Sequence, residues 1–192
     1  MVHAVLEVGR DGRRAHQLEV TGSPDVSGAD LEVVAAQLGR PPRATRRIAH
    51  RCLCGQPDVV ETSPRLADGT PFPTLYYLTC PLARSAVGRL EASGLMREMT
   101  ARLATDESLA ARYQEAHEDY LARRNAIADL GTTVTAGGMP RRVKCLHVLV
   151  AHSLAVGPGV NPLGDEVLAL LPPWWADGQC VASPAAEDVA AS

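Results

Sequence analysis

The stretch RRIAHRCLCGQPDVVETSPRLADGTPFPTLYYLTC, residues 46–80, decides the fold, because it holds three short segments that favour β-strands. All three are apolar or rich in β-branched residues, as strands usually are. GQP at 55–57 and ADG at 67–69 provide turn residues between them. Connections this short favour antiparallel pairing. The expected strands are residues 48–54, 58–62 and 74–79.

Helical periodicity surrounds this β region on both sides. Before it, residues 27–38 begin with Ser27 and Asp30 at capping-box spacing and stop at Gly39. After it, the longest helical pattern is expected to end at Gly131, with a flexible loop over 131–139. The sequence therefore predicts an α+β fold, in which a small antiparallel β-sheet is packed by several helices and helix dominates. The helices expected after the strands are 81–92, 95–104, 106–130, 140–156 and 164–171.

The length of 192 residues suits a single domain, which we expect over residues 27–180. Residues 1–26 are expected to be an N-terminal extension, flexible or folded as a hairpin, since VHAVLEV and AHQLEV flank GRDGR. Residues 181–192, VASPAAEDVAAS, are small and polar, and we expect a disordered tail.

Composition argues against two classes of partner. The net charge of −3 disfavours generic binding to nucleic acid. No run approaches the roughly 18 apolar residues that a membrane span requires, and the first residues lack the order of a signal peptide. We therefore expect a cytoplasmic protein, in which the five cysteines are reduced. Composition does not indicate a small-molecule or protein partner.

Several stretches together resemble a known family. The most distinctive are HRCLCGQPDVVET (50–62), DGTPFPTLYYLTCP (68–81) and GGMPRRVKCLHVLVAHSLAVGPGVNPLGDEVL (137–168). They are similar to the bacterial, mainly actinobacterial, family catalogued as domain of unknown function 501. The resemblance extends roughly from Asp30 to Cys180 and implies no particular activity or cofactor.

Cysteine and histidine are the residues with the clearest potential chemistry. Thiolates and imidazoles are the ligands of zinc, and thiolates also hold iron–sulfur clusters. The spacing is not that of a paired CxxC zinc ribbon, so the ligands would have to come from separate segments. We expect the protein to bind zinc or an iron–sulfur cluster through cysteine and histidine side chains. The candidate ligands are Cys52, Cys54, Cys80, Cys145, His147 and Cys180.

Helical geometry limits how these residues combine. In a regular helix Cys145 and His147 point to roughly opposite faces, because successive residues turn by about 100°. Either Cys145 precedes the regular helix, or only one residue of this segment binds metal. We expect Cys52, Cys80 and Cys145 as ligands. The fourth ligand stays open among Cys54, His147 and Cys180.

Two other functions compete with metal binding, and the sequence does not decide whether the protein is an enzyme. A small enzyme could use Cys145, His147 or His152 on a small molecule, since imidazole titrates near neutrality. Alternatively, the cysteines are inert and buried, and the protein is a non-catalytic interaction module.

Several other features favour structural roles. His117 is expected in the core, and Asp119 is expected to be a solvated helix charge. Trp174 and Trp175 are expected to pack the chain end onto the domain. GPGVNPLGDE (157–166) is expected to be a bend followed by a helix cap.

Overall fold

The structure of the protein, a computed structural model, describes residues 26–182. The N-terminal extension expected over residues 1–26 lies outside the described residues except for Val26. The tail expected over 181–192 likewise lies outside them except for Val181 and Ala182.

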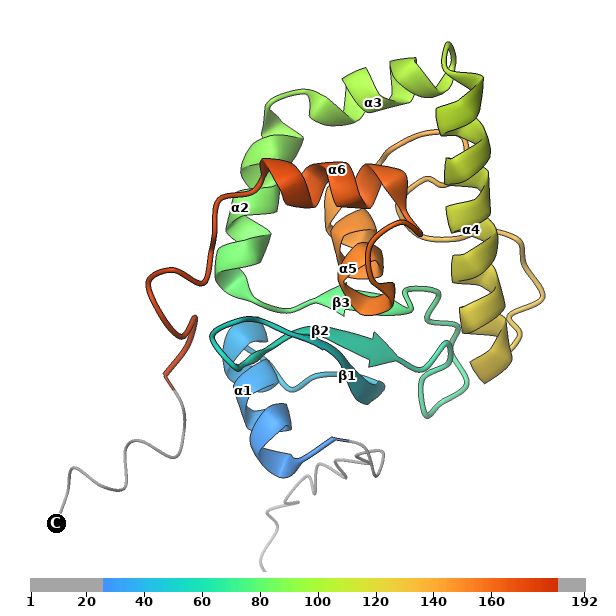
Figure 1. Ribbon diagram of the computed structural model, residues 1–192. Helices are drawn as coiled ribbons and strands as arrows, with labels where there is room; N and C mark the ends of the chain where they lie inside the picture. The colour runs from blue at the N-terminus through green and yellow to red at the C-terminus, as the bar shows by residue number, and fades with distance from the viewer. Residues whose placement is uncertain (1–25, 183–192) are drawn as a thin grey trace, which may run out of the picture.

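The described chain begins with a helix, continues into three strands and ends in five helices, which confirms the expected α+β class. Figure 1 shows the order of the elements. Their bounds are α1 (Gly28–Leu38), β1 (Thr45–Arg51), β2 (Pro57–Thr62), β3 (Tyr76–Leu78), α2 (Pro81–Ala92), α3 (Leu95–Leu103), α4 (Glu107–Ile127), α5 (Leu146–Val156) and α6 (Pro162–Leu170).

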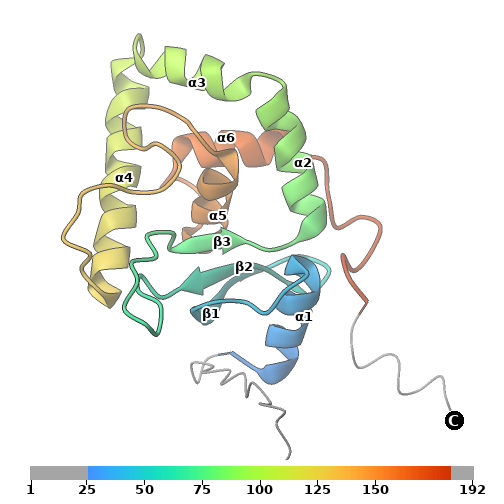
Figure 2. The same cartoon turned by 180° about the vertical axis from the view of Figure 1, so that it is seen from behind.

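The three strands form one antiparallel sheet in the order β1-β2-β3. Figures 1 and 2 show α1 on one side of the sheet and α2, α5 and α6 on the other. All six residues of β2 are buried, because this central strand has a neighbour on each edge and helices over both faces. The expected antiparallel pairing is therefore confirmed.

The first strand begins and ends three residues earlier than expected, and it keeps the expected length of seven residues. β1 ends at Arg51, whereas the sequence predicted a strand through Cys54. A turn begins at Cys52, whose carbonyl oxygen accepts the Gly55 N–H at 2.8 Å. Gly55 has a φ of +87°, a conformation that glycine adopts readily and that closes the turn early. Cys52 and Cys54 therefore lie in the connection to β2 rather than on one face of a strand.

The loop after α4 is anchored rather than flexible. α4 ends at Ile127, before the expected Gly131, and Arg124 in its last turn is completely buried. The Arg124 guanidinium donates to the carbonyl oxygens of Val134 at 2.6 Å and Thr132 at 2.7 Å. Because a buried guanidinium needs acceptors for its N–H groups, the loop wraps around it.

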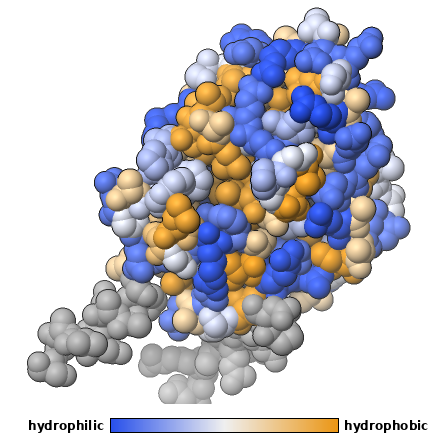
Figure 3. All heavy atoms as spheres, in the orientation of Figure 1, coloured by the Kyte–Doolittle hydropathy of each residue, from blue (hydrophilic) through white to orange (hydrophobic). Residues whose placement is uncertain are grey.

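Helix α5 is the centre of the core. Leu146, Leu149 and Val150 on this helix are fully buried, and the helix packs on β3, α2 and α6. It begins at Leu146 rather than near Pro140, since the preceding chain forms turns. Within residues 26–182, no helix is both long and apolar enough to cross a bilayer. Figure 3 shows apolar side chains interspersed with polar ones on one face.

The close packing of α6 on α5 predicts a stability effect at Gly164. A Cβ at this position would overlap the Leu149 carbonyl oxygen and the Ser153 hydroxyl oxygen. Gly164→Ala should therefore destabilise the protein by about 1–3 kcal/mol, as overpacked cores do. Urea unfolding followed by circular dichroism measures the change.

Gly88 on α2 provides the matched control, because a Cβ there meets no atom within 4 Å. Gly88→Ala should be neutral or stabilising by about 0.5–1 kcal/mol, since alanine favours helix more than glycine does. Equal effects of the two substitutions would contradict the packing described for α5 and α6.

Candidate metal centre

Cys145 occupies the N-cap position of α5. Its backbone is extended, with φ −154° and ψ 114°, and the regular helix begins only at Leu146. The opposite-face constraint of a regular helix therefore does not apply to Cys145 and His147. Of the two arrangements that the sequence left open, the one in which Cys145 precedes the helix is confirmed.

Glu91, in the last turn of α2, is the third residue of the site. Its Oε1 accepts the Leu146 N–H at 2.7 Å and lies 3.1 Å from His147 Nδ1. The Cys145 sulfur, a His147 ring nitrogen and a Glu91 carboxylate oxygen all lie within 4.8 Å of one another. All three residues are half-buried, so an ion can reach them from solvent.

The His147 ring is held in one orientation by the backbone of α2. His147 Nε2 lies 3.1 Å from the Arg84 carbonyl oxygen. Because a carbonyl only accepts, Nε2 carries the hydrogen and a neutral ring presents the Nδ1 lone pair to Glu91. A carboxylate oxygen has no hydrogen to donate to that lone pair. A proton on Nδ1, or a cation beside it, satisfies both groups.

The protonation of His147 follows from these neighbours. Its contact with the Cys145 side chain and its hydrogen bond with Glu91 raise the pKa of His147 to about 9, while burial acts in the opposite direction. In the metal-free protein the imidazole is therefore charged at neutral pH. The Glu91 carboxylate that favours this proton also favours a metal cation.

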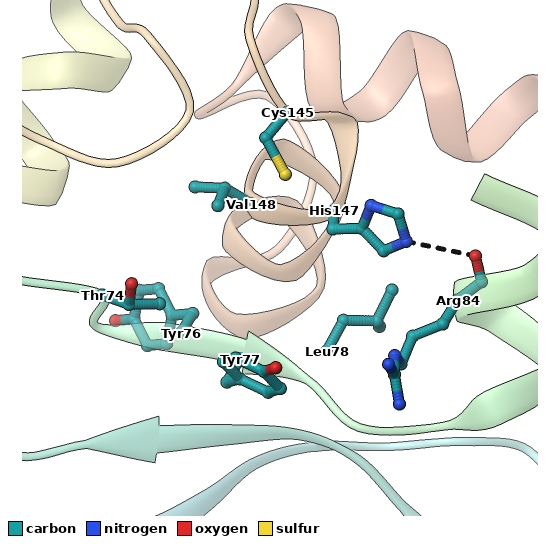
Figure 4. Close-up of a pocket in the computed structure, with 8 residues that line it drawn as sticks. All are labelled: Thr74, Tyr76, Tyr77, Leu78, Arg84, Cys145, His147 and Val148. Atoms are coloured by element: carbon teal, nitrogen blue, oxygen red, sulfur yellow. Dashed lines mark hydrogen bonds between the residues drawn. The ribbon is translucent and has the colours of Figure 1, made fainter. Parts of the chain in front are cut away.

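A pocket of about 300 Å³ opens beside Cys145 and His147. Figure 4 shows both side chains above β3, with the His147 ring directed toward α2. Arg84 lines the pocket, and no ion pair involves it among the described residues. A small molecule that entered here would meet a thiol, an imidazole and a guanidinium. The lining residues are Thr74, Tyr76, Tyr77, Leu78, Arg84, Cys145, His147 and Val148.

The remaining candidate ligands gather elsewhere. Cys52 and Cys54 are in the β1–β2 turn, Cys80 is the N-cap of α2, and Cys180 contacts the side chain of Gln56, at the other end of that turn. The only group of three donor atoms within 4.8 Å in the described part of the chain is that of Glu91, Cys145 and His147. The structure thus divides the six predicted ligands between two places.

His152 is separate from the pocket and has a structural environment. It is fully buried, stacks on Tyr76, and its Nε2 lies 3.0 Å from an Asp119 oxygen. The sequence had predicted Asp119 as a solvated helix charge, and this prediction was wrong, because its carboxylate pairs with the buried His152. Burial lowers the pKa of His152. His117 is also buried, beside the Thr135 hydroxyl at 3.1 Å, as expected of a core histidine.

The segment that holds Trp174 and Trp175 packs onto the domain as predicted. The Trp174 ring contacts the hydrophobic core and meets Trp175 edge-on, at 4.7 Å between centroids. The bend at 157–166 ends in a cap, where the Asn161 side chain accepts the Gly164 N–H at 3.0 Å. These features are structural, and they leave the pocket at Cys145 as the clearest candidate site.

Comparison with known families agrees with the resemblance seen in the sequence. Residues 48–169, more than half of the chain, match the family described as "Protein of unknown function (DUF501)". The chain belongs to the DUF501 family. Glu91, Cys145 and His147 all lie inside the matched segment. No curated protein and no solved structure matches the chain at a significant level.

Glu91 is the site residue that sequence reasoning missed. It lies in LEASG (90–94), on a helix with other charged residues, and far in sequence from Cys145. Its one recognisable signal was its position near the end of a predicted helix, which is a poor place for a carboxylate because of the helix dipole. An acidic residue there gains from a partner that supplies N–H groups, as the start of α5 does.

The raised pKa of His147 predicts how stability depends on pH in the metal-free protein. An unfolded histidine titrates near pH 6.5, and His147 in the folded state near 9. The folded state therefore binds the proton more tightly. The stabilising effect of this proton is complete below about pH 6.5 and is lost as pH rises through about 9. The pH titration of the His147 ring by NMR, with urea unfolding across this range, measures both effects.

Glu91→Gln tests whether the Glu91 carboxylate causes the raised pKa of His147. It should lower the pKa of His147 and reduce the loss of stability above pH 6.5, because the carboxylate that holds the proton is gone. Glu98→Gln, at an exposed position on α3, is the matched control and should leave the titration unchanged. A wild-type His147 that titrates near 6.5 would contradict this account.

Proposed function

We propose that this protein binds a zinc ion through Glu91, Cys145 and His147 and acts on a small molecule in the adjoining pocket. The observation that carries the proposal is the convergence of three different donor atoms within 4.8 Å. Tetrahedral zinc, with bonds of about 2.0–2.3 Å, needs its ligand atoms about 3.4–3.8 Å apart. Small side-chain rotations reach that spacing, and His147 Nδ1 and Glu91 Oε1 are already 3.1 Å apart.

The environment of the ligands supports a metal site. Zinc-bound histidines usually donate their other ring N–H to a carbonyl or carboxylate, which orients the ring. The Arg84 carbonyl oxygen, 3.1 Å from His147 Nε2, has this role here. A thiolate, an imidazole and a carboxylate together suit zinc better than magnesium or calcium, which prefer oxygen ligands alone.

The number of ligands favours a reactive site over a purely structural one. Catalytic zinc sites have three protein ligands and keep a fourth position for water or substrate, whereas structural sites have four. The pocket at Cys145 provides space for a substrate. Arg84 in its wall favours an anionic or strongly polar small molecule, since guanidinium binds carboxylate and phosphate groups well. The five free thiols suit the reducing cytoplasm that the sequence predicts.

The same residues suggest a second candidate, a thiol enzyme in which His147 activates Cys145. Thiol enzymes place the nucleophile at one imidazole nitrogen and the orienting group at the other. Here the Arg84 carbonyl accepts from Nε2, while Glu91 lies at Nδ1. Figure 4 shows the Cys145 sulfur on the Nδ1 side as well. Two donors on one side of the ring favour a shared metal over a catalytic triad.

Zinc titration of the metal-free protein by isothermal calorimetry tests the proposal. Glu91→Gln and His147→Ala should each abolish one zinc-binding event per chain. The loss should exceed the roughly 10–100-fold that removal of a group hydrogen-bonded to a metal ligand costs, because each substitution removes a direct ligand. Glu98→Gln, exposed on α3, is the matched control and should bind zinc as the wild type does.

Wild-type affinity and stoichiometry in both ligand variants would refute the zinc site. In that case, alkylation of Cys145 by iodoacetamide distinguishes the second candidate. Faster alkylation in the metal-free wild type than in His147→Ala would favour a thiol enzyme, because the imidazolium would then be stabilising the reactive thiolate.

A further inference from the structure

Four of the five cysteines lie together on a side of the molecule away from the Cys145 pocket. They come from three segments that are distant in sequence: the β1–β2 turn, the start of α2 and the chain end near Cys180. Figures 1 and 2 both show these three segments meeting beside α1. The proposed zinc site does not involve any of them.

Two glutamine side chains fix the chain end against the turn. Gln37 Nε2, on α1, donates to the Cys180 sulfur at 3.2 Å and to the Pro57 carbonyl oxygen at 2.7 Å. Gln56 Oε1 accepts from the Cys180 thiol at 3.1 Å, and the Gln56 Nε2 donates to the Val181 carbonyl oxygen at 2.8 Å. Cys180 is thus oriented inward, toward the turn that carries Cys52 and Cys54.

The thiols also interact with one another. Burial, together with a contact with Cys54, raises the pKa of Cys52 to about 11. A contact with Cys180, followed by burial, raises the pKa of Cys80. The partner Cys180 has a lowered pKa, first because of Cys80 and also because of the Gln37 amide, whereas charges on Cys52 and Cys54 oppose the shift. The Cys52 side chain thus neighbours that of Cys54, and the Cys80 side chain neighbours that of Cys180.

Backbone N–H groups lie near two of the sulfurs. The N–H groups of Leu82 and Ala83, at the start of α2, lie near the Cys80 sulfur and act to lower its pKa, although they do not close into a capping hydrogen bond. The Cys54 N–H acts on Cys52 in the same way. Donors aimed at sulfur stabilise negative charge, which a thiol lacks and a metal-bound thiolate has.

Simple core packing does not explain this arrangement. Cys52 and Cys80 are buried, but Cys54 and Cys180 are half-exposed and Cys180 is bonded to polar side chains. Gln37 is only 5% exposed, and its Oε1 has no hydrogen-bond partner. A buried amide with an unpartnered oxygen is costly. The Nε2 of the same amide donates to the Cys180 sulfur, so Gln37 orients that side chain.

We propose that Cys52, Cys54, Cys80 and Cys180 form a second metal centre, in which four thiolates hold a soft metal and fasten the chain end to the sheet. Four protein ligands leave no open position on a zinc ion, and four cysteines also complete the ligand set of an iron–sulfur cluster. The occupant is a zinc ion or an iron–sulfur cluster. No three of these sulfurs lie within 4.8 Å of one another, whereas zinc needs about 3.8 Å between sulfurs. The wider spacing favours the cluster.

Metal analysis of the full-length protein, purified anaerobically, tests the second centre. Cys54→Ser and Cys180→Ser change half-exposed residues and should each lose this metal. Cys145→Ser is the matched control, because it should lose only the zinc at the pocket. Iron with acid-labile sulfide and visible absorption identifies a cluster, and additional colourless zinc identifies a zinc ion. The zinc site at the pocket and the centre of four thiolates can therefore be refuted independently of each other.

A measurement on the wild-type protein tests the second centre even where the serine variants do not fold. Cys54 and Cys180 should resist alkylation by iodoacetamide until a chelator removes the metal, and mass spectrometry locates the modified residues. The proposal is overturned if Cys54→Ser and Cys180→Ser retain the full wild-type metal content. It is also overturned if both thiols are alkylated equally before and after chelation.

Discussion

The hydrogen bond from the Leu146 N–H to Glu91 is the interaction on which the candidate site depends. It joins the first residue of α5 to the last turn of α2 at 2.7 Å. Free N–H groups at a helix start favour a carboxylate, and the helix dipole adds to this attraction. The bond fixes α5 against α2, so that His147 reaches both Glu91 and the Arg84 carbonyl oxygen. Without it, Cys145 and His147 would have no common partner.

Helix α2 carries one residue of each proposed metal site, at opposite ends of the helix. Cys80 caps its start and belongs to the group of four thiols, whereas Glu91 in its last turn belongs to the half-buried group beside the pocket. Eleven residues at 1.5 Å per residue place their backbones about 16 Å apart along the helix. The first group suits a structural metal that closes the fold, and the second keeps one side free for a small molecule.

Local signals predicted the elements, and long-range contacts determined the site. Pro81 and the periodicity after it marked α2 from first to last residue, because caps and apolar spacing act within a helix. The strand through Cys54 was wrong, because Gly55 closes the turn earlier. No local pattern indicated that Glu91 meets Cys145, or that Gln37 and Cys180 meet. Such pairs form only when separate elements pack, so a single sequence does not contain their geometry.

The central claim is that Glu91, Cys145 and His147 share one zinc ion. Anomalous diffraction at the zinc absorption edge, from crystals of the zinc-loaded protein, tests it most directly. The account predicts a peak bonded to all three side chains, about 2.3 Å from the Cys145 sulfur and about 2.0–2.2 Å from the nitrogen and oxygen ligands. Zinc-loaded crystals with no anomalous peak between these three residues would contradict it.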